Sequence, residues 1–300
     1  MPSIRHQFVA RVIPKVRKSS EVGDPDQARR SKLAVHANAA TAPPKRLVTG
    51  CEVSLIDGHG FPIYDLKIRG TSPQRSVIYL HGGGYVSHAD RVHWKYVVRL
   101  ARRLEARIIF PVYPLAPEFT WRDSNPELLS LFEHIAIESP RGVTLAGDSA
   151  GGGYALSIAQ QLALRAGPQP THVVLISPWL DLTNSAPGIA EASARDPWLK
   201  LSWLRLYADW WAGGDELSRA ELSPLYGDLS GLPPTLMFCG TRDTLHPSCR
   251  QLAERALEQG WDLTYVEEPD LLHVYPILPI PEAKTALTQL VDFLLVDFLG

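Results

Sequence analysis

Short apolar runs alternate with amphipathic helices along most of the chain, and this pattern constrains the fold more than any other feature of the sequence. The first two runs flank Asp57-Gly58-His59-Gly60, which is typical of a β-hairpin. The residues expected to form strands are 52–56, 63–69, 76–80, 107–112, 143–146, 173–177, 235–239 and 263–267. The residues expected to form the later helices are 91–106, 127–138, a stretch beginning near 149, 248–259 and 282–298. Repeated strand–helix units predict an α/β fold, with an eight-stranded, mostly parallel sheet flanked by helices on both faces.

The composition of the 300 residues excludes several classes of protein. Hydrophobic residues make up 45% and charged residues 21%, which is typical of a globular protein rather than a disordered one. The net charge of −2 gives no general attraction to nucleic acid, and no apolar stretch approaches the roughly 18 residues of a membrane span. The three cysteines form no CxxC pair, and the N-terminus lacks the apolar core of a secretory signal. We therefore expect a cytoplasmic protein without a metal site.

The N-terminal region, residues 1–44, differs from the rest of the chain. Its first 20 residues carry five basic side chains and no acidic one. The apolar residues of this segment recur at four-residue steps, at Ile4, Phe8, Val12 and Val16. This spacing indicates one apolar helical face, although Pro14 interrupts it, and we expect that face to pack on the body of the protein. The alternative is weak association of residues 1–18 with an anionic membrane surface, which would carry the protein down with sedimenting vesicles. A second helix is expected at 26–39.

The segment from Gly147 to Gly152 reads Gly-Asp-Ser-Ala-Gly-Gly, follows an apolar strand and opens an apolar helix. This is the G-x-S-x-G pattern in the strand–turn–helix setting that exposes a nucleophilic serine. Small residues are needed because the turn is tight, and larger side chains on either side of the nucleophile would collide with neighbouring elements. The pattern makes Ser149 the candidate nucleophile, and Asp148 is expected to make local hydrogen bonds. The alternative is a glycine-rich turn without chemistry.

A second glycine-rich segment, His81-Gly82-Gly83-Gly84, follows one of the expected strands. Glycines let backbone N–H groups converge on one point, as an oxyanion hole requires. The candidate donors are the N–H groups of Gly82, Gly83 and Ala150. We expect His81 and Gly84 to support the loop, with His81 holding it in shape. A phosphate-binding loop is disfavoured because no Gly-Lys-Ser or G-x-G-x-x-G pattern follows.

A serine nucleophile needs a base, and the base needs an orienting carboxylate. In α/β hydrolases these groups follow the serine in the order acid, then histidine. His273 lies between an expected strand and the last helix, where the base should be, and Asp243 follows the expected strand 235–239 at its carboxyl end. The weaker alternatives are His172 and His246 for the base, and Asp270 and Glu268 for the acid.

Together these blocks resemble the hormone-sensitive-lipase-like family of α/β hydrolases, in particular its bacterial esterases and acetyl hydrolases. The matching blocks are 81–84, 113–118 (Tyr-Pro-Leu-Ala-Pro-Glu), 147–152, 177–183 (Ser-Pro-Trp-Leu-Asp-Leu-Thr), Asp243 and His273. The resemblance covers about residues 45–298 and implies a catalytic domain at 45–300. It also implies a helical cap, made of residues 1–44 and an insertion at about 183–222, and a homodimer paired through the edge strand 263–267.

Two positions depart from the family pattern. Pro114 replaces an arginine, which leaves a structural ion pair near Glu118 without its usual partner, and His246 stands where the family often has an acid. Neither change touches the residues that the family uses for catalysis. The resemblance therefore implies hydrolysis of small carboxylic esters with short acyl chains, through Ser149, Asp243 and His273 and without a cofactor. A lactone hydrolase or an N-acetyl or amide deacetylase would use the same triad. A non-catalytic receptor on this fold is disfavoured because the base histidine is present.

The aromatic residues are unevenly distributed, since five of the eight tryptophans lie between Trp179 and Trp211. Large rings in the expected insertion could wall an apolar substrate pocket. The residues expected to line that pocket are Tyr85, Trp179, Trp198, Trp203 and Val274. Trp210 and Trp211 are at least as well explained as contacts that attach the insertion to the body.

Overall fold

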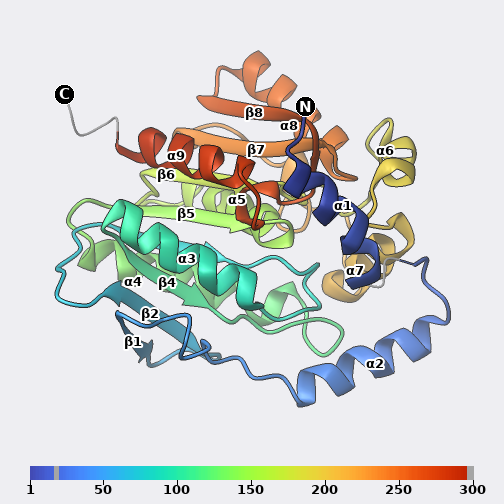
Figure 1. The fold of residues 1–300 in the computed structure, drawn as a ribbon. Helices are drawn as coiled ribbons and strands as arrows, with labels where there is room; N and C mark the ends of the chain where they lie inside the picture. Colours follow the sequence, from blue (N-terminus) through green and yellow to red (C-terminus); the bar gives the residue numbers. More distant parts are fainter. Residues whose placement is uncertain (17–19, 296–300) are drawn as a thin grey trace.

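The computed structural model describes residues 1–16 and 20–295, and their strands form one twisted sheet (Figure 1). The strands are β1 (Cys51–Ile56), β2 (Ile63–Ile68), β3 (Ser76–Leu80), β4 (Arg107–Pro111), β5 (Val143–Asp148), β6 (His172–Ile176), β7 (Thr235–Arg242) and β8 (Leu263–Leu272). Their order across the sheet is β1-β2-β4-β3-β5-β6-β7-β8, and β2 is antiparallel to both of its neighbours while every later pair is parallel. The predicted α/β fold with an eight-stranded, mostly parallel sheet is confirmed.

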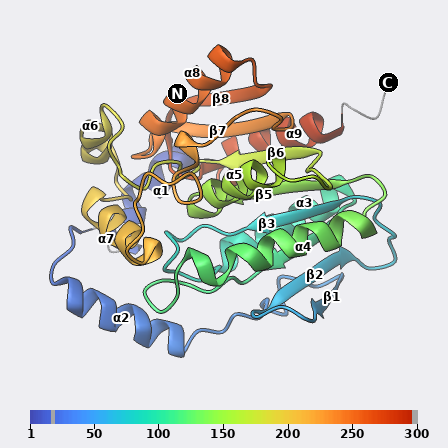
Figure 2. The same cartoon turned by 180° about the vertical axis from the view of Figure 1, so that it is seen from behind.

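Helices cover both faces of this sheet. They are α1 (Ile4–Val16), α2 (Pro25–Ala37), α3 (Arg91–Leu104), α4 (Asn125–Glu138), α5 (Ala150–Ala163), α6 (Ile189–Arg195), α7 (Leu201–Ala212), α8 (His246–Gln259) and α9 (Glu282–Leu295). One core lies between the sheet and α3 and α9, and the other lies between the sheet and α4, α5 and α8 (Figures 1 and 2). Successive residues of β3 point to opposite cores, as the pleat of a strand requires. The last three residues of the predicted helix 282–298 lie outside the described residues.

The carboxyl ends of β7 and β8 reach further than the sequence predicts. β8 continues through Glu268 and Asp270 to Leu272, so that His273 follows the strand directly. Polar residues hide this extension from a hydrophobicity pattern, and the pairing with β7 is irregular between Gly240 and Arg242. The longer strand places the loop that carries His273 at the same edge of the sheet as Ser149.

Helix α1 does not pack the face that its apolar periodicity predicts. Ile4, Phe8 and Val16 are 85%, 65% and 68% exposed, whereas His6, Ala10 and Ile13 are buried. The rotation of the helix is set by His6, whose Nε2 accepts the backbone N–H of Leu272 at 3.1 Å. The expectation that the four-residue stripe packs on the body is therefore wrong. Association with a membrane surface stays a prediction, and two of the residues named for it, Arg17 and Lys18, lie outside the described residues.

Helices α1, α2, α6 and α7 group at the end of the sheet toward which β5 points, as both ribbon views show (Figures 1 and 2). The N-terminal segment is tied to α7 by hydrogen bonds from Trp203 Nε1 to Ser20 O and from Val22 N to Ser202 Oγ, at 2.7 and 3.1 Å. No helix within the described residues is long and apolar enough to cross a bilayer. The segments 1–44 and 183–222 thus meet above the carboxyl edge of the sheet.

Candidate active site

Ser149 lies on the sharp turn between β5 and α5. Its backbone has φ 53° and ψ −124°, a conformation that a residue with a Cβ rarely adopts, and its N–H donates to Ile176 O at 2.8 Å. The glycines around it are required by close approach, because a Cβ on Gly147 would collide with Gly151 O and one on Gly151 with Leu80 O. The turn therefore presents the Ser149 hydroxyl at the end of the sheet.

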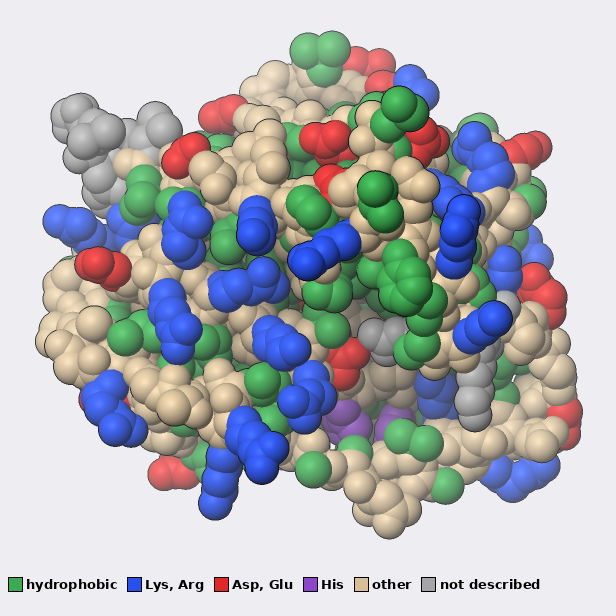
Figure 3. Space-filling view, in the orientation of Figure 1, with side chains coloured by type: hydrophobic (Ala, Val, Ile, Leu, Met, Phe, Trp, Pro, Cys, Tyr) green, Lys and Arg blue, Asp and Glu red, His purple; other side chains and the backbone are tan. Residues whose placement is uncertain are grey.

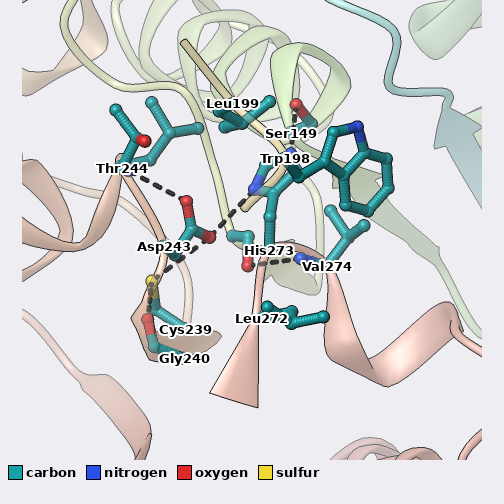
Figure 4. Close-up of polar contacts among 12 residues, drawn as sticks. Ser149, Trp198, Leu199, Cys239, Gly240, Asp243, Thr244, Leu272, His273 and Val274 are labelled. Atoms are coloured by element: carbon teal, nitrogen blue, oxygen red, sulfur yellow. Dashed lines mark hydrogen bonds and ion pairs between the residues drawn. The ribbon is translucent and has the colours of Figure 1, made fainter. Parts of the chain in front are cut away.

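Three side chains from three loops meet at this hydroxyl (Figure 4). His273 Nε2 lies 2.9 Å from Ser149 Oγ, and His273 Nδ1 lies 2.9 Å from Asp243 Oδ2. The other carboxylate oxygen, Asp243 Oδ1, accepts the N–H of Leu245 at 2.9 Å. All three side chains are buried, with His273 2% and Asp243 0% exposed. The arrangement has the linear serine–imidazole–carboxylate form that activates a serine.

The alternative residues lie elsewhere. His246 Nε2 contacts Glu267 Oε2 at 2.7 Å, and His172 stacks edge-on against Phe293. The exposed Asp270 donates its backbone N–H to Thr241, and Glu268 lies within β8. The structure brings none of these four residues to Ser149.

The charges around His273, above all that of Asp243, favour its protonated form. Burial by itself would lower the pKa of His273, but the Asp243 carboxylate and, at longer range, those of Asp196 and Asp148 raise it above its ordinary value. An imidazole with a raised pKa is a stronger base toward the serine hydroxyl.

The glycine loop differs from the prediction at one donor. The N–H of Gly82 donates to Asp148 Oδ1 at 3.0 Å, so that it is not available to a substrate oxygen. Among the described residues, no acceptor is found for the N–H groups of Gly83, Gly84 and Ala150. Gly83 and Gly84 have φ 129° and 63°, backbone conformations that glycine adopts readily and other residues rarely do. The candidate oxyanion donors are therefore Gly83, Gly84 and Ala150, and the assignment of Gly82 is corrected because its N–H is engaged by Asp148.

Asp148 supports the same loop. Besides Gly82 N, its carboxylate accepts the Tyr79 hydroxyl at 2.8 Å and lies 3.3 Å from His93 Nε2. Burial alone would lower the pKa of His93, but Asp148 together with Asp90, which lies 3.1 Å from Nδ1, raises it to about 10. The raised pKa favours the charged form of His93, which would pair with the Asp148 carboxylate directly beneath the nucleophile turn.

His81 and Glu118 take different positions. His81 Nδ1 lies 2.8 Å from Gly82 O, its ring stacks on Tyr113, and its backbone carbonyl accepts the Tyr113 hydroxyl at 2.6 Å. Burial lowers the pKa of His81 to about 4, so the ring is neutral and holds the loop by packing and hydrogen bonding. Glu118 is exposed, and no ion pair of Glu118 is found within the described residues.

A cavity of about 410 Å³ opens beside Ser149 and His273. Trp198, Trp203 and Val274 line it as expected, and the Trp198 ring meets His273 edge-on with centroids 5.3 Å apart. Tyr85 and Trp179 do not line it. They are 2% and 1% exposed and stack in the core, where Tyr85 lies flat on Trp211 at 4.4 Å. Their assignment to the pocket is corrected, because Tyr85 packs against both Trp179 and Trp211 and neither Tyr85 nor Trp179 borders the cavity.

Asp196 is a positioning residue that the sequence does not reveal. It lies between α6 and α7 and is 1% exposed. Its Oδ2 accepts hydrogen bonds from the N–H and the hydroxyl of Thr244, the residue after Asp243, both at 2.9 Å. Its other oxygen accepts the N–H groups of Trp198 and Leu199. Burial and the neighbouring Asp243 raise the pKa of Asp196. An acid within an insertion carries no motif, so only its burial identifies it.

Asp196→Asn is expected to lower kcat about tenfold, because an amide has one accepting oxygen and cannot accept both the bonds from Thr244 and those from the N–H groups of Trp198 and Leu199. Loss of the negative charge also lowers the pKa of His273, since Asp196 contributes to raising it. The limb of the pH–rate profile in which His273 loses its proton should therefore move to lower pH. Asp209→Asn, at an exposed position of α7, is the matched control. An unchanged limb in the Asp196 variant would reduce this residue to a purely structural role.

Comparison with known proteins identifies the family of this chain. A family model described as alpha/beta hydrolase fold matches residues 77–277. An acetyl-hydrolase of Streptomyces hygroscopicus is 33% identical over 211 residues, which are 68% of this chain and 71% of the relative. An esterase of Acinetobacter venetianus is 25% identical over 234 residues, which are 76% of this chain and 77% of the relative. The crystal structure of an esterase from the bacterial hormone-sensitive lipase family is 27% identical, with a TM-score of 0.80 over 98% of each chain. The chain is a serine ester hydrolase and belongs to the hormone-sensitive-lipase-like family of α/β hydrolases.

Proposed function

We propose that the protein hydrolyses small carboxylic esters with short acyl chains by two-step acyl transfer through Ser149. The single observation that carries this proposal is the hydrogen-bonded series from Ser149 Oγ through His273 to Asp243, with both bonds at 2.9 Å. The N–H groups of the glycine loop lie beside the same hydroxyl, in the cavity that a substrate would enter. Nucleophile, base and oxyanion donors are then in place for acyl transfer.

In the first step Ser149 Oγ attacks the ester carbonyl while its proton passes to His273 Nε2. The carbonyl oxygen becomes an oxyanion that accepts N–H bonds from Gly83, Gly84 and Ala150. Collapse of this intermediate breaks the bond to the alcohol, which leaves with the proton held by His273. In the second step water attacks the acyl-enzyme, His273 takes the proton of the water, and the acid product leaves with Ser149 reprotonated. Asp243 holds the imidazole in place and stabilises its charged form.

The preference for short acyl chains rests on the size and walls of the cavity. Its volume of about 410 Å³ is near the lower end for ligand pockets. Trp198 and Trp203 enclose it from the segment 183–222, and Lys32 reaches it from the N-terminal region. We infer that residues 1–44 and 183–222 act together as a cap that limits acyl length.

Trp203→Ala should raise kcat/KM for 4-nitrophenyl hexanoate relative to kcat/KM for 4-nitrophenyl acetate, and an unchanged ratio would contradict this role.

A fluorophosphonate probe tests the proposed chemistry directly. The probe should label the folded protein once, on the peptide that carries Ser149, because only an activated serine reacts rapidly with it. Absence of labelling on folded protein would overturn the proposal and would favour a non-catalytic receptor. A panel of esters, lactones and N-acetyl compounds, compared by kcat/KM, then measures the leaving-group preference. Higher values for lactones or amides than for esters would assign the triad to one of those reactions instead.

A further inference from the structure

Helix α2 approaches the active-site cavity with basic side chains instead of apolar ones. No residue of α2 is buried, and Val35, an apolar residue, is 61% exposed. The side chains of α2 that contact the body of the protein lie on one helical face and are Arg29, Lys32 and His36. Arg29 donates to Pro117 O at 3.3 Å, and His36 Nε2 lies 2.9 Å from Val86 O. Hydrophobic packing therefore does not explain why this helix lies where it does.

Lys32 is the member of this face that enters the cavity. It lines the same space as Ser149 and His273, its Nζ lies 3.1 Å from Ser87 Oγ, and it stands over the Tyr207 ring at 5.2 Å. Tyr207 in turn packs on the glycine loop, since a Cβ on Gly84 would lie 2.9 Å from its ring. Lys32 is thus connected through two contacts to the loop that carries the oxyanion donors.

The ammonium of Lys32 has no carboxylate counter-ion in the part of the chain that the structure describes. Burial alone lowers its pKa to about 8. The acids that line the cavity are engaged elsewhere, because Asp148 and Asp90 both flank His93. Lys200, the other lysine of the cavity, donates to Asp196 O. A partly desolvated cation without a counter-ion is stabilised when an anion binds beside it.

His88, in the same wall, has a polar atom without a hydrogen-bond partner among the described residues. This atom, the ring Nδ1, is buried. Burial and the neighbouring His36 lower the pKa of His88, so its neutral ring can donate one hydrogen bond. Figure 3 shows histidine side chains in a recess above the C-terminal end of α2. Lys32, Ser87 and His88 together offer three donors on one side of the cavity.

We propose that Lys32, Ser87 and His88 form a subsite for a carboxylate of the substrate, so that the preferred esters carry an acidic group away from the scissile bond. This inference rests on the proposed function and names its substrate class. The carboxylate would accept hydrogen bonds from Lys32 Nζ, Ser87 Oγ and the His88 ring while the ester lies at Ser149. Monoesters of short dicarboxylic acids have this form.

Monomethyl hexanedioate and dimethyl hexanedioate provide the test, because they differ in charge and hardly in length. We expect the wild-type protein to prefer the anionic monoester, measured as kcat/KM from chromatographic assay of the products. Lys32→Met should reduce kcat/KM for the monoester about tenfold, mainly through KM, and change kcat/KM for the diester by less than about twofold. Lys32→Glu should reduce it further. Arg29→Met, on the same helical face but outside the cavity, is the control and should change neither ester.

Equal losses on both esters in Lys32→Met would show that Lys32 only ties α2 to the body, and would overturn the subsite. No change on either ester would overturn it as well. If the wild-type protein hydrolyses neither ester, 4-nitrophenyl acetate decides whether the proposed function fails, and calorimetry decides the subsite. In that case hexanedioate should bind the wild-type protein about tenfold more tightly than it binds Lys32→Met, and equal binding would reject the subsite.

Discussion

Ser149→Ala is expected to lower kcat for 4-nitrophenyl acetate and butyrate by about 10⁴-fold or more. The alanine removes the atom that would form the acyl-enzyme, and no other hydroxyl in the described residues lies within hydrogen-bond distance of His273 Nε2. A residual rate above that of water should remain, because the oxyanion donors and the cavity are untouched. The fold should persist, since the Ser149 hydroxyl makes its one recorded hydrogen bond to His273 and not to the core.

Ser157→Ala is the matched control for this variant. Ser157 lies on the same helix, α5, and its hydroxyl donates to Glu221 O at 2.9 Å, away from the triad. It should keep the wild-type kcat even though loss of the bond to Glu221 O lowers its unfolding temperature, whereas Ser149→Ala should unfold near the wild-type temperature. Hydrolysis by a correctly folded Ser149→Ala protein at the wild-type rate would reject Ser149 as the nucleophile.

The fold could be predicted from the sequence because its main signals are local. Apolar runs and helical periodicity identify the sheet, and two glycine-rich blocks mark the turns that follow β3 and β5. What periodicity cannot supply is the contact that chooses between two faces of a helix. In α1 a hydrogen bond from Leu272 N to His6 turns the apolar stripe of Ile4 and Phe8 to solvent.

The candidate site likewise contains residues that the sequence predicts and residues that it does not. Ser149, Asp243 and His273 were identifiable because each follows an element in a known order. Among three consecutive glycines, however, the sequence pattern cannot tell which N–H is free, and only the folded chain shows that Asp148 occupies the N–H of Gly82. Lone polar residues such as Asp196 and His93 carry no motif, so their roles appear only once their burial and partners are known.

The aromatic cluster shows what composition alone can contribute. It correctly draws attention to the insertion, since Trp198 and Trp203 line the cavity. It cannot separate these rings from Trp179 and Trp211, which lie 1% exposed in the core. The two pairs differ in position. Trp203 on α7 and Trp198 in the loop before it border the cavity, whereas Trp179 and Trp211 stack with Tyr85 in the core.

His93→Gln is expected to destabilise the protein by about 3 kcal/mol, and adding Asp148→Asn is expected to restore part of that loss. Asp148 is 2% exposed, and the charged form of His93 that the raised pKa favours would compensate the charge of its carboxylate. Removing the cation leaves a buried charge whose remaining hydrogen bonds, as far as the structure describes the chain, come from Tyr79 and Gly82. The double variant replaces the ion pair by two amides and removes that charge, so it should be more stable than His93→Gln alone.

The pH dependence of stability provides an independent readout of the same pair. The pKa of His93 is about 10 in the folded protein, against 6.5 for an ordinary histidine. The stabilisation from its proton is therefore fully present below about pH 6.5 and is lost as the pH rises through about 10. Between pH 7 and 10 the free energy of unfolding, measured with urea, should fall more steeply for the wild type than for either variant. Groups that titrate elsewhere affect all three proteins alike, so equal slopes, or a double variant no more stable than His93→Gln, would show that the pair does not stabilise the nucleophile turn.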